Sequence, residues 1–316
     1  MSLIVDGLVI SNWDRKVFED MRAGGLSAAN CTCSIWEDMP STMRNIATWK
    51  RMFRDNADLI VQVYDVEDIE KARQQGKVGI FLGWQNSTGF DDYLPFVEVF
   101  HELGIRAVQL TYNTANMAGS GCYESNDGGL TDFGRELVHE MNRVGILVDL
   151  SHVGARTARD VISAAKRPVS YTHCCPSALF PHSRNKSDDD LRFIADHGGF
   201  VGVAGVPSFL RRKLESTVDD YVDAMLHVIN VIGEDRVGLG TDITQGQGQD
   251  FFDWIASDKG YGRTLVDMGG LPILGGFVTL RDYGNIVAAM EKRMKPATMD
   301  KILGKNWISF LREVWA

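Results

Sequence analysis

Two histidines and one aspartate, each directly after a short apolar run, are the side chains best suited to chemistry: His152, His173 and Asp242. Two imidazoles and a carboxylate can hold a divalent metal ion, or they can share proton transfer without one. A single histidine is more often a hydrogen-bonded structural residue than a ligand. Three such groups at equivalent places in the chain favour a common functional site.

The elements that must position these groups are short apolar runs that alternate with helical patterns. Near-continuous apolar runs are typical of parallel strands buried on both faces. The eight predicted strands are Leu3–Asp6, Ala28–Cys33, Val78–Trp84, Ala107–Tyr112, Leu147–Ser151, Pro168–Thr172, Gly199–Ala204 and Val237–Thr241. Helical spacing of apolar residues is found between them, for example over Phe133–Val144 and Val218–Ile232. Eight strand–helix units predict an α/β fold, a (β/α)8 TIM barrel with reactive residues at the carboxyl ends of its strands.

We expect one domain, because the 316 residues contain no internal repeat and no convincing linker. A Gly-rich stretch at about 245–276 is predicted to be a long active-site loop, since long loops in compact domains are often functional. C-terminal helices are expected at about 280–314. The predicted barrel domain therefore spans residues 1–316.

Composition excludes several classes of protein. The net charge of −9 and the pI near 5.3 argue against binding to duplex nucleic acid or anchoring through a polybasic segment. Neither a secretory signal pattern nor an apolar stretch of about 18 residues is found, so we expect no membrane association. Five cysteines do not suggest a secreted disulfide framework. We therefore expect a cytoplasmic protein.

Five stretches of the sequence resemble the renal (membrane) dipeptidase family, a branch of the amidohydrolase superfamily. They are Gly129–Gly134, Gly145–His152, Ser183–Asp189, Val237–Asp242 and Ile302–Asn306. The resemblance runs from about residue 3 to residue 312 and implies a barrel of the metal-dependent-hydrolase type. It also implies two zinc ions at the barrel mouth, a bridging hydroxide that attacks a peptide carbonyl, and a homodimer.

Half of the family's functional residues are present in this sequence. By resemblance, His152 and His173 match the two histidines that hold the second zinc ion, and Asp242 matches the catalytic acid/base. Arg184, in Ser183-Arg-Asn185, matches the arginine that binds the substrate carboxylate. A guanidinium suits that role because it offers a planar, bidentate fork of donors.

The other half is replaced. Leu8 and Ile10 stand where the family has the His-x-Asp pair of the first metal, and Gln85 stands where it has the bridging Glu. Tyr112 replaces a substrate-binding His. With Asn113 beside it, we expect Tyr112, together with Gln85, to line the substrate site. A dication among apolar side chains would be costly, so the sequence predicts one zinc ion at most, or none.

Three functions remain open at this stage. The first is a dipeptidase-like amidohydrolase that cleaves an amide or peptide bond in a small substrate bearing a carboxylate. The second is a metal-independent isomerase or lyase on the same barrel. The third is a non-catalytic protein that binds a small carboxylate. In each case the expected partner is a small molecule, and the chain is expected to form a homodimer.

Overall fold

A computed structural model describes residues 3–316 and shows a closed barrel of eight parallel strands. In order around the barrel these are β1 (Val5–Val9), β2 (Ala28–Ser34), β4 (Val78–Trp84), β5 (Ile105–Gln109), β6 (Leu147–Asp149), β7 (Ser170–Cys174), β8 (Phe200–Val203) and β9 (Val237–Leu239). β9 pairs with β1 and closes the ring, and every residue of these eight strands is buried. The (β/α)8 barrel predicted from the sequence is confirmed.

A ninth strand, β3 (Ile60–Gln62), lies outside the ring and was not predicted. It pairs only with the beginning of β4, where Ile60 is opposite Val78, whereas the end of β4 pairs with β5. Three residues are too few to show a strand periodicity. The strand is therefore visible only through its tertiary pairing.

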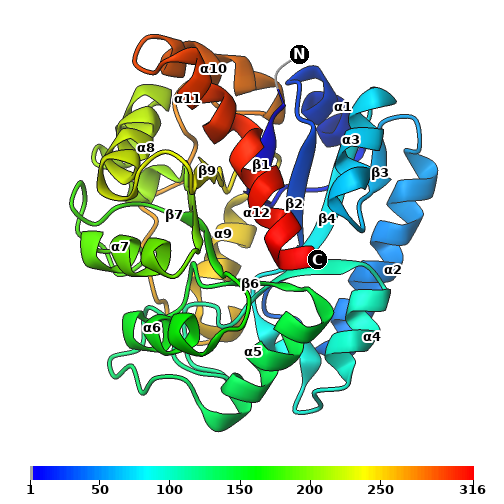
Figure 1. Cartoon of the computed structure of the whole chain (residues 1–316), viewed down its shortest axis with the longest axis vertical. Helices are drawn as coiled ribbons and strands as arrows, with labels where there is room; N and C mark the ends of the chain where they lie inside the picture. The colour runs from blue at the N-terminus through cyan, green and yellow to red at the C-terminus, as the bar shows by residue number, and fades with distance from the viewer. Residues whose placement is uncertain (1–2) are drawn as a thin grey trace.

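Helices surround the barrel (Figure 1). Their bounds are α1 (Arg15–Ala23), α2 (Met39–Asp55), α3 (Val66–Gln74), α4 (Phe96–Glu102), α5 (Asp132–Val144), α6 (Ala155–Ala164), α7 (Asp188–Asp196), α8 (Val218–Ile232) and α10 (Tyr283–Glu291). Local signals fix their ends: the Thr131 side chain accepts a hydrogen bond from the Gly134 N–H at the start of α5, and Gly145 ends that helix with φ of 86°. No helix within residues 3–316 is both long and apolar enough to cross a bilayer.

The Gly-rich stretch at 245–276 is not a continuous loop, which corrects the prediction from the sequence. It contains a helix, α9 (Gln249–Ala256), which buries Phe252 and Ala256. These two residues are four positions apart and share one helix face. The many flanking glycines hid this short amphipathic pattern. The rest of the stretch contains a short 3-10 helix (Asp258–Gly260) and otherwise turns and irregular segments.

The C-terminal helices close the opposite end of the barrel. They comprise α11 (Pro296–Asp300), a π-helical turn (Lys301–Lys305) and α12 (Asn306–Trp315), which crosses the barrel end nearest the viewer in Figure 1. Trp307 of α12 is fully buried and donates from Nε1 to the Leu239 carbonyl at 2.8 Å. It packs with the first residues of several strands, among them Val5 and Phe200. The amino ends of the strands are therefore sealed, and only the carboxyl ends are open to a ligand.

Candidate active site

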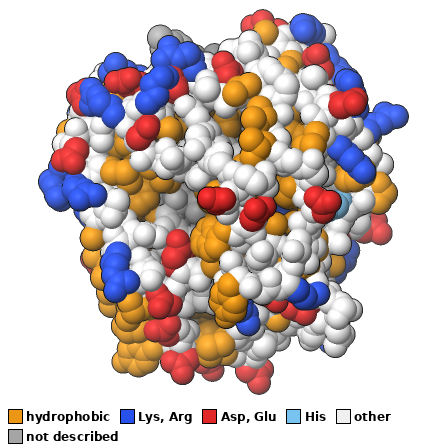
Figure 2. All heavy atoms as spheres, turned by 180° about the vertical axis from the view of Figure 1, so that it is seen from behind, with side chains coloured by type: hydrophobic (Ala, Val, Ile, Leu, Met, Phe, Trp, Pro, Cys, Tyr) orange, Lys and Arg blue, Asp and Glu red, His pale blue; other side chains and the backbone are white. Residues whose placement is uncertain are grey.

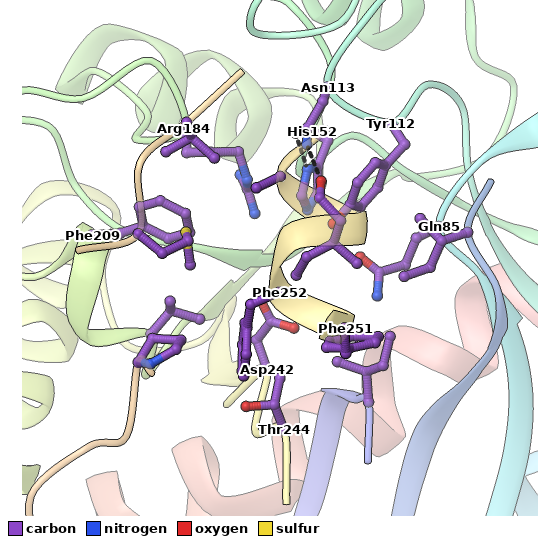
Figure 3. A pocket seen from close by; sticks show the side chains of 18 of the residues that line it. Gln85, Tyr112, Asn113, His152, Arg184, Phe209, Asp242, Thr244, Phe251 and Phe252 are labelled. Atoms are coloured by element: carbon purple, nitrogen blue, oxygen red, sulfur yellow. Dashed lines mark hydrogen bonds between the residues drawn. The ribbon is translucent and has the colours of Figure 1, made fainter. Parts of the chain in front are cut away.

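A pocket lies at the carboxyl ends of the strands, where the reactive residues of such barrels are found. We call it the central pocket. Six of the seven site residues expected from the sequence line it: Gln85, Tyr112, Asn113, His152, Arg184 and Asp242 (Figure 3). His173 is completely buried behind His152 and does not line the cavity. Apolar side chains gather on this face of the molecule (Figure 2), which is opposite to the one in Figure 1.

The two histidines face each other. His152 Nε2 lies 3.0 Å from His173 Nε2, and His152 Nδ1 lies 2.7 Å from Asn113 Oδ1. Because an amide oxygen only accepts, Nδ1 of His152 donates and its Nε2 points its lone pair toward His173. Burial, and then the charge of Arg184, hold the pKa of both imidazoles well below the usual value, so both are neutral at pH 7.

A buried carboxyl on β6 fixes the neighbouring strand that carries His173. Asp149 accepts hydrogen bonds from the Thr172 N–H at 3.0 Å and from the Thr172 hydroxyl at 2.7 Å. The same hydroxyl lies 2.8 Å from His173 Nδ1. Asp149 also accepts from the N–H and the hydroxyl of Ser151, and the Ser151 hydroxyl accepts from the His173 N–H. Thr172 therefore orients the His173 ring.

The same arrangement recurs at the strand end that carries Asp242. Asp6 accepts from the Thr241 N–H at 2.9 Å and from the Thr241 hydroxyl at 2.6 Å, as Asp149 does from Thr172. Asp6 also accepts hydrogen bonds from the Tyr283 hydroxyl and from the Leu8 N–H. In both places an aspartate inside the barrel binds a threonine on the adjoining strand. The residue after each threonine, His173 or Asp242, is thereby held at the mouth.

Asp242 has an unusual backbone and an unusual pKa. Its φ of 57° is in the left-handed region, which costs a non-glycine residue about 1 kcal/mol or more. Asn113, on the opposite wall, shares this feature with φ of 61°. Burial raises the pKa of the Asp242 carboxyl to about 7, against a smaller opposite effect of Arg184. A carboxyl that titrates near neutrality can both take up and release a proton.

Arg184 is a buried cation bound only to neutral groups. Its side chain is 1% exposed, and its guanidinium donates to the carbonyls of Ser151 at 2.5 Å and His173 at 3.2 Å. Its Nε has no hydrogen-bond partner within the described part of the chain. The guanidinium also lies over the Phe209 ring, 5.5 Å from the centroid. The two carbonyls hold the guanidinium in place, and its remaining N–H groups are available to donate to an anion.

An apolar cluster surrounds Ile10, which by resemblance stands at a ligand position of the first metal ion. Ile10, Ile35 and Tyr112 form a small buried core against which Phe251 and Ile255 of the α9 region pack. Leu8, the other replaced ligand, is 2% exposed inside the barrel, and the Gln85 amide donates to Thr32 Oγ1 at 3.0 Å. Leu8, Ile10 and Ile35 offer neither charge nor lone pairs to a dication, and the Gln85 amide and the Tyr112 hydroxyl offer only neutral oxygens.

His152 and His173 are the two side chains of the site best suited to hold a metal ion. Two imidazole nitrogens 3.0 Å apart, each ring held through its other nitrogen, are arranged as histidines that share one zinc ion. Within residues 3–316, no three His, Cys, Asp or Glu side chains are grouped as metal ligands. An ion held by His152 and His173 would therefore rely on water or substrate for its remaining ligands.

Several functional residues were not identified from the sequence. Thr172 is a common strand residue, and only the fold places it between Asp149 and His173. Phe209 lines the central pocket from a single 3-10 turn (Pro207–Phe209), and Tyr123 lines it from a loop. The apolar wall from Phe251 to Met268 was expected only as a loop. None of these residues carries a local pattern that distinguishes it from an ordinary packing residue.

A barrel sealed at its amino end, with histidines, an acid and an arginine at its mouth, defines the class of (β/α)8 amidohydrolase-like proteins. Residues 14–258 match the family described as membrane dipeptidase (peptidase family M19). The chain belongs to this family, which confirms the resemblance seen in the sequence.

Known relatives agree with this assignment. The chain is 30% identical to dipeptidase tcpJ of Claviceps purpurea over 280 residues, which cover 87% of this chain and 60% of that protein. An amidohydrolase from Pseudomonas aeruginosa superimposes with a TM-score of 0.98 at 51% identity, covering 99% of this chain and 97% of that one. A metallo peptidase from Rhodobacter sphaeroides, liganded with a phosphinate mimic of the dipeptide L-Ala-D-Ala, gives a TM-score of 0.83 at 19% identity, and both chains are covered completely. The last similarity concerns the fold alone.

Proposed function

We propose that this protein is a dipeptidase-like amidohydrolase that cleaves an amide or peptide bond in a small substrate bearing a carboxylate. The observation that carries the proposal is the buried Arg184, whose guanidinium binds two carbonyls and whose Nε has no partner within residues 3–316. A buried cation is stable only with compensating interactions. A substrate carboxylate in the central pocket would supply them in the bidentate geometry that a guanidinium favours.

The reacting bond would lie between Arg184 and Asp242. The pKa of about 7 allows Asp242 to remove a proton from the attacking water and to return it to the leaving nitrogen. His152 and His173 would hold at most one zinc ion, which when bound lowers the pKa of a coordinated water and makes it a nucleophile. Tyr112 stacks on the His152 ring, 4.2 Å between centroids, and keeps that ring in its orientation.

The remaining walls indicate the character of the substrate body. Phe209, Phe251, Phe252, Val266 and Met268 give the central pocket a largely apolar lining. Such walls exclude water and favour a substrate with an apolar side chain. The dipeptide mimic bound by the Rhodobacter protein supports a substrate of this size. We therefore expect N-acyl amino acids or dipeptides with apolar residues.

A second candidate is metal-independent proton transfer on a small carboxylate, as in an isomerase or lyase. It is favoured by the apolar cluster of Ile10, Ile35 and Tyr112 in place of the first metal. Asp242 and the neutral His152 would then be the acid and base. A protein that only binds the carboxylate is the third outcome, and it predicts affinity without turnover.

The test is a hydrolysis screen that follows the release of free amine from dipeptides and N-acyl amino acids, with and without added zinc. The wild-type protein is compared with Asp242→Asn and with Glu136→Asn, a change on the exposed surface of α5. We expect turnover that is lost in Asp242→Asn and kept in the control. Turnover that survives in Asp242→Asn would contradict the proposed role. Carboxylate binding without turnover on any substrate would favour the non-catalytic alternative.

The cytoplasmic location and the homodimer remain predictions. Light scattering on the purified chain would measure the mass in solution directly. A mass near twice 35.1 kDa is expected, and a mass near 35.1 kDa would contradict the dimer.

A further inference from the structure

A second cavity, with about 780 Å³ of empty volume, lies beside the central pocket between α2 and the α9 region. We call it the side pocket. Ile10, Ile35 and Phe251 line both cavities and form the partition between them. Phe251 is seen at the edge of the central pocket in Figure 3. None of the reactive groups described above lines the side pocket, so the proposed hydrolysis leaves it unexplained.

Among the residues that the structure describes, Glu37 is the only one with a charged side chain that lines the side pocket. Its Oε2 accepts from the Ile35 N–H at 2.6 Å, and its Oε1 accepts from the Asn45 amide at 3.3 Å. Both donors are neutral, so they hold the carboxylate in place without cancelling its charge. Each oxygen keeps acceptor capacity for a further partner. The cavity therefore carries one fixed negative charge.

Four aromatic side chains also line the side pocket: Trp13, Trp49, Phe251 and Trp254. Trp13 and Trp49 lie with ring centroids 4.9 Å apart at 60°, and Trp13 Nε1 donates to the Thr32 carbonyl at 3.3 Å. Trp254 and Phe251 contribute two more rings from α9, 6.1 Å apart at 47°.

A carboxylate surrounded by aromatic rings favours organic cations as ligands. The face of an aromatic ring attracts a cation through its quadrupole, and tryptophan does so most strongly. Several rings with one carboxylate suit an alkylated ammonium group, which is large, weakly hydrated and apolar on its surface. A metal ion is a poor fit, since it needs several oxygen or nitrogen ligands. An anion would be repelled by Glu37.

We propose that the side pocket binds a small organic cation of the quaternary or alkylated ammonium class, held by Glu37 and the rings of Trp13, Trp49, Trp254 and Phe251. The Ser11 hydroxyl, which is buried and without a partner within the described residues, lines the same cavity and is available to a hydroxyl on the ligand. The site is separate from the carboxylate site at Arg184. It does not depend on the proposed hydrolysis.

The test is titration of the whole protein with choline, followed by calorimetry and by tryptophan fluorescence. The neutral probe 3,3-dimethylbutan-1-ol has the same shape without the charge. We expect saturable binding of choline, quenching or a shift of the emission, and affinity for the neutral probe weaker by about tenfold or more. Equal affinity for the two probes, or no choline binding at millimolar concentration, would overturn the proposal.

Two variants locate the site. Glu37→Gln removes the charge and keeps the shape, and we expect it to weaken choline binding by about tenfold. Its control is Glu136→Gln, the same change on α5. Thr48→Phe places a ring into the side pocket from the exposed face of α2 and should block binding without touching Glu37. Unchanged binding in both variants would refute the site, and unfolding curves identify a variant that is merely misfolded.

An Arg184→Met variant distinguishes the two cavities. We expect choline affinity to be unchanged in it, because the partition of Ile10, Ile35 and Phe251 separates the side pocket from the guanidinium. Loss of choline binding in Arg184→Met together with normal binding in Glu37→Gln would place the cation in the central pocket and overturn the proposal.

Discussion

Replacing Arg184 by methionine should remove the preference of the central pocket for a carboxylate. Of the five N–H donors of a guanidinium, two are used by the carbonyls of Ser151 and His173. A hydrogen bond to a charged group contributes about 1.5–3 kcal/mol, so two such bonds from a bidentate carboxylate contribute at least about 3 kcal/mol. This corresponds to a loss in affinity of roughly 150-fold, at 1.4 kcal/mol per factor of ten.

The assay compares the dissociation constants of N-acetyl-leucine and N-acetyl-leucinamide by calorimetry. The wild-type protein should bind the acid about 100-fold more tightly than the amide. Arg184→Met should lose this preference, and Arg184→Lys, which keeps the charge but not the fork, should retain part of it. An Arg184→Met variant that folds normally and still prefers the acid would refute the reasoning, because some other group would then bind the carboxylate.

Further predictions concern the Asp242 carboxyl, the Thr172 hydroxyl that orients His173, and the replaced ligands of the first metal ion. Folding raises the pKa of Asp242 from 3.8 to about 7. Between these pH values the folded state therefore binds more protons than the unfolded state does. The free energy of unfolding should fall as pH rises through this window, by at most about 4 kcal/mol. Asp242→Asn should flatten this slope in urea unfolding at pH 5 and 8; an unchanged slope would contradict the burial of this charge. Thr172→Val should lower the free energy of unfolding by about 1–3 kcal/mol, while Thr172→Ser changes it little; equal stability of the two variants would show that the hydroxyl does not matter. The triple change Leu8→His, Ile10→Asp and Gln85→Glu should raise zinc content by one ion per chain in elemental analysis and lower stability; unchanged zinc content would indicate that backbone geometry also excludes the first metal.

The fold was accessible from the sequence because barrel strands buried on both faces are continuous apolar runs. Val78–Trp84 shows this most clearly, since the predicted and observed limits agree. Strand ends were less accurate: β7 ends at Cys174 and not at Thr172, so His173 belongs to the strand itself. The backbone hydrogen bonds that end a strand are formed with its neighbours, and a local pattern does not contain them.

The candidate site was only partly predictable. His152 and Asp242 stood out as polar residues that follow apolar runs, and Arg184 was identified only through the resemblance to the family. The structure brings all three to one pocket. Nothing in the sequence revealed that His152 and His173 would face each other at 3.0 Å. Such contacts join residues on different strands, and they depend on the stagger of strands around the barrel.

The apolar wall of the central pocket was also only partly predictable from the sequence. Phe251 and Phe252 belong to the stretch that was expected as an active-site loop, and the sequence did not show that they are part of a helix. Eight residues between glycine-rich flanks give weak helical periodicity. What stabilises α9 is contact with the barrel mouth, where Phe252 is 3% exposed. The sequence shows which residues are apolar but not the surface that they cover.

The measurement that tests the central claim most directly is zinc content per chain by elemental analysis, after loading with excess zinc and removal of the unbound ion. It is made beside a His152→Ala/His173→Ala variant. We predict no more than one ion per chain in the wild-type protein and none in the double variant, because Leu8, Ile10 and Gln85 replace the ligands of the first metal. Two ions per chain, or one ion that remains in the double variant, would contradict the site described here.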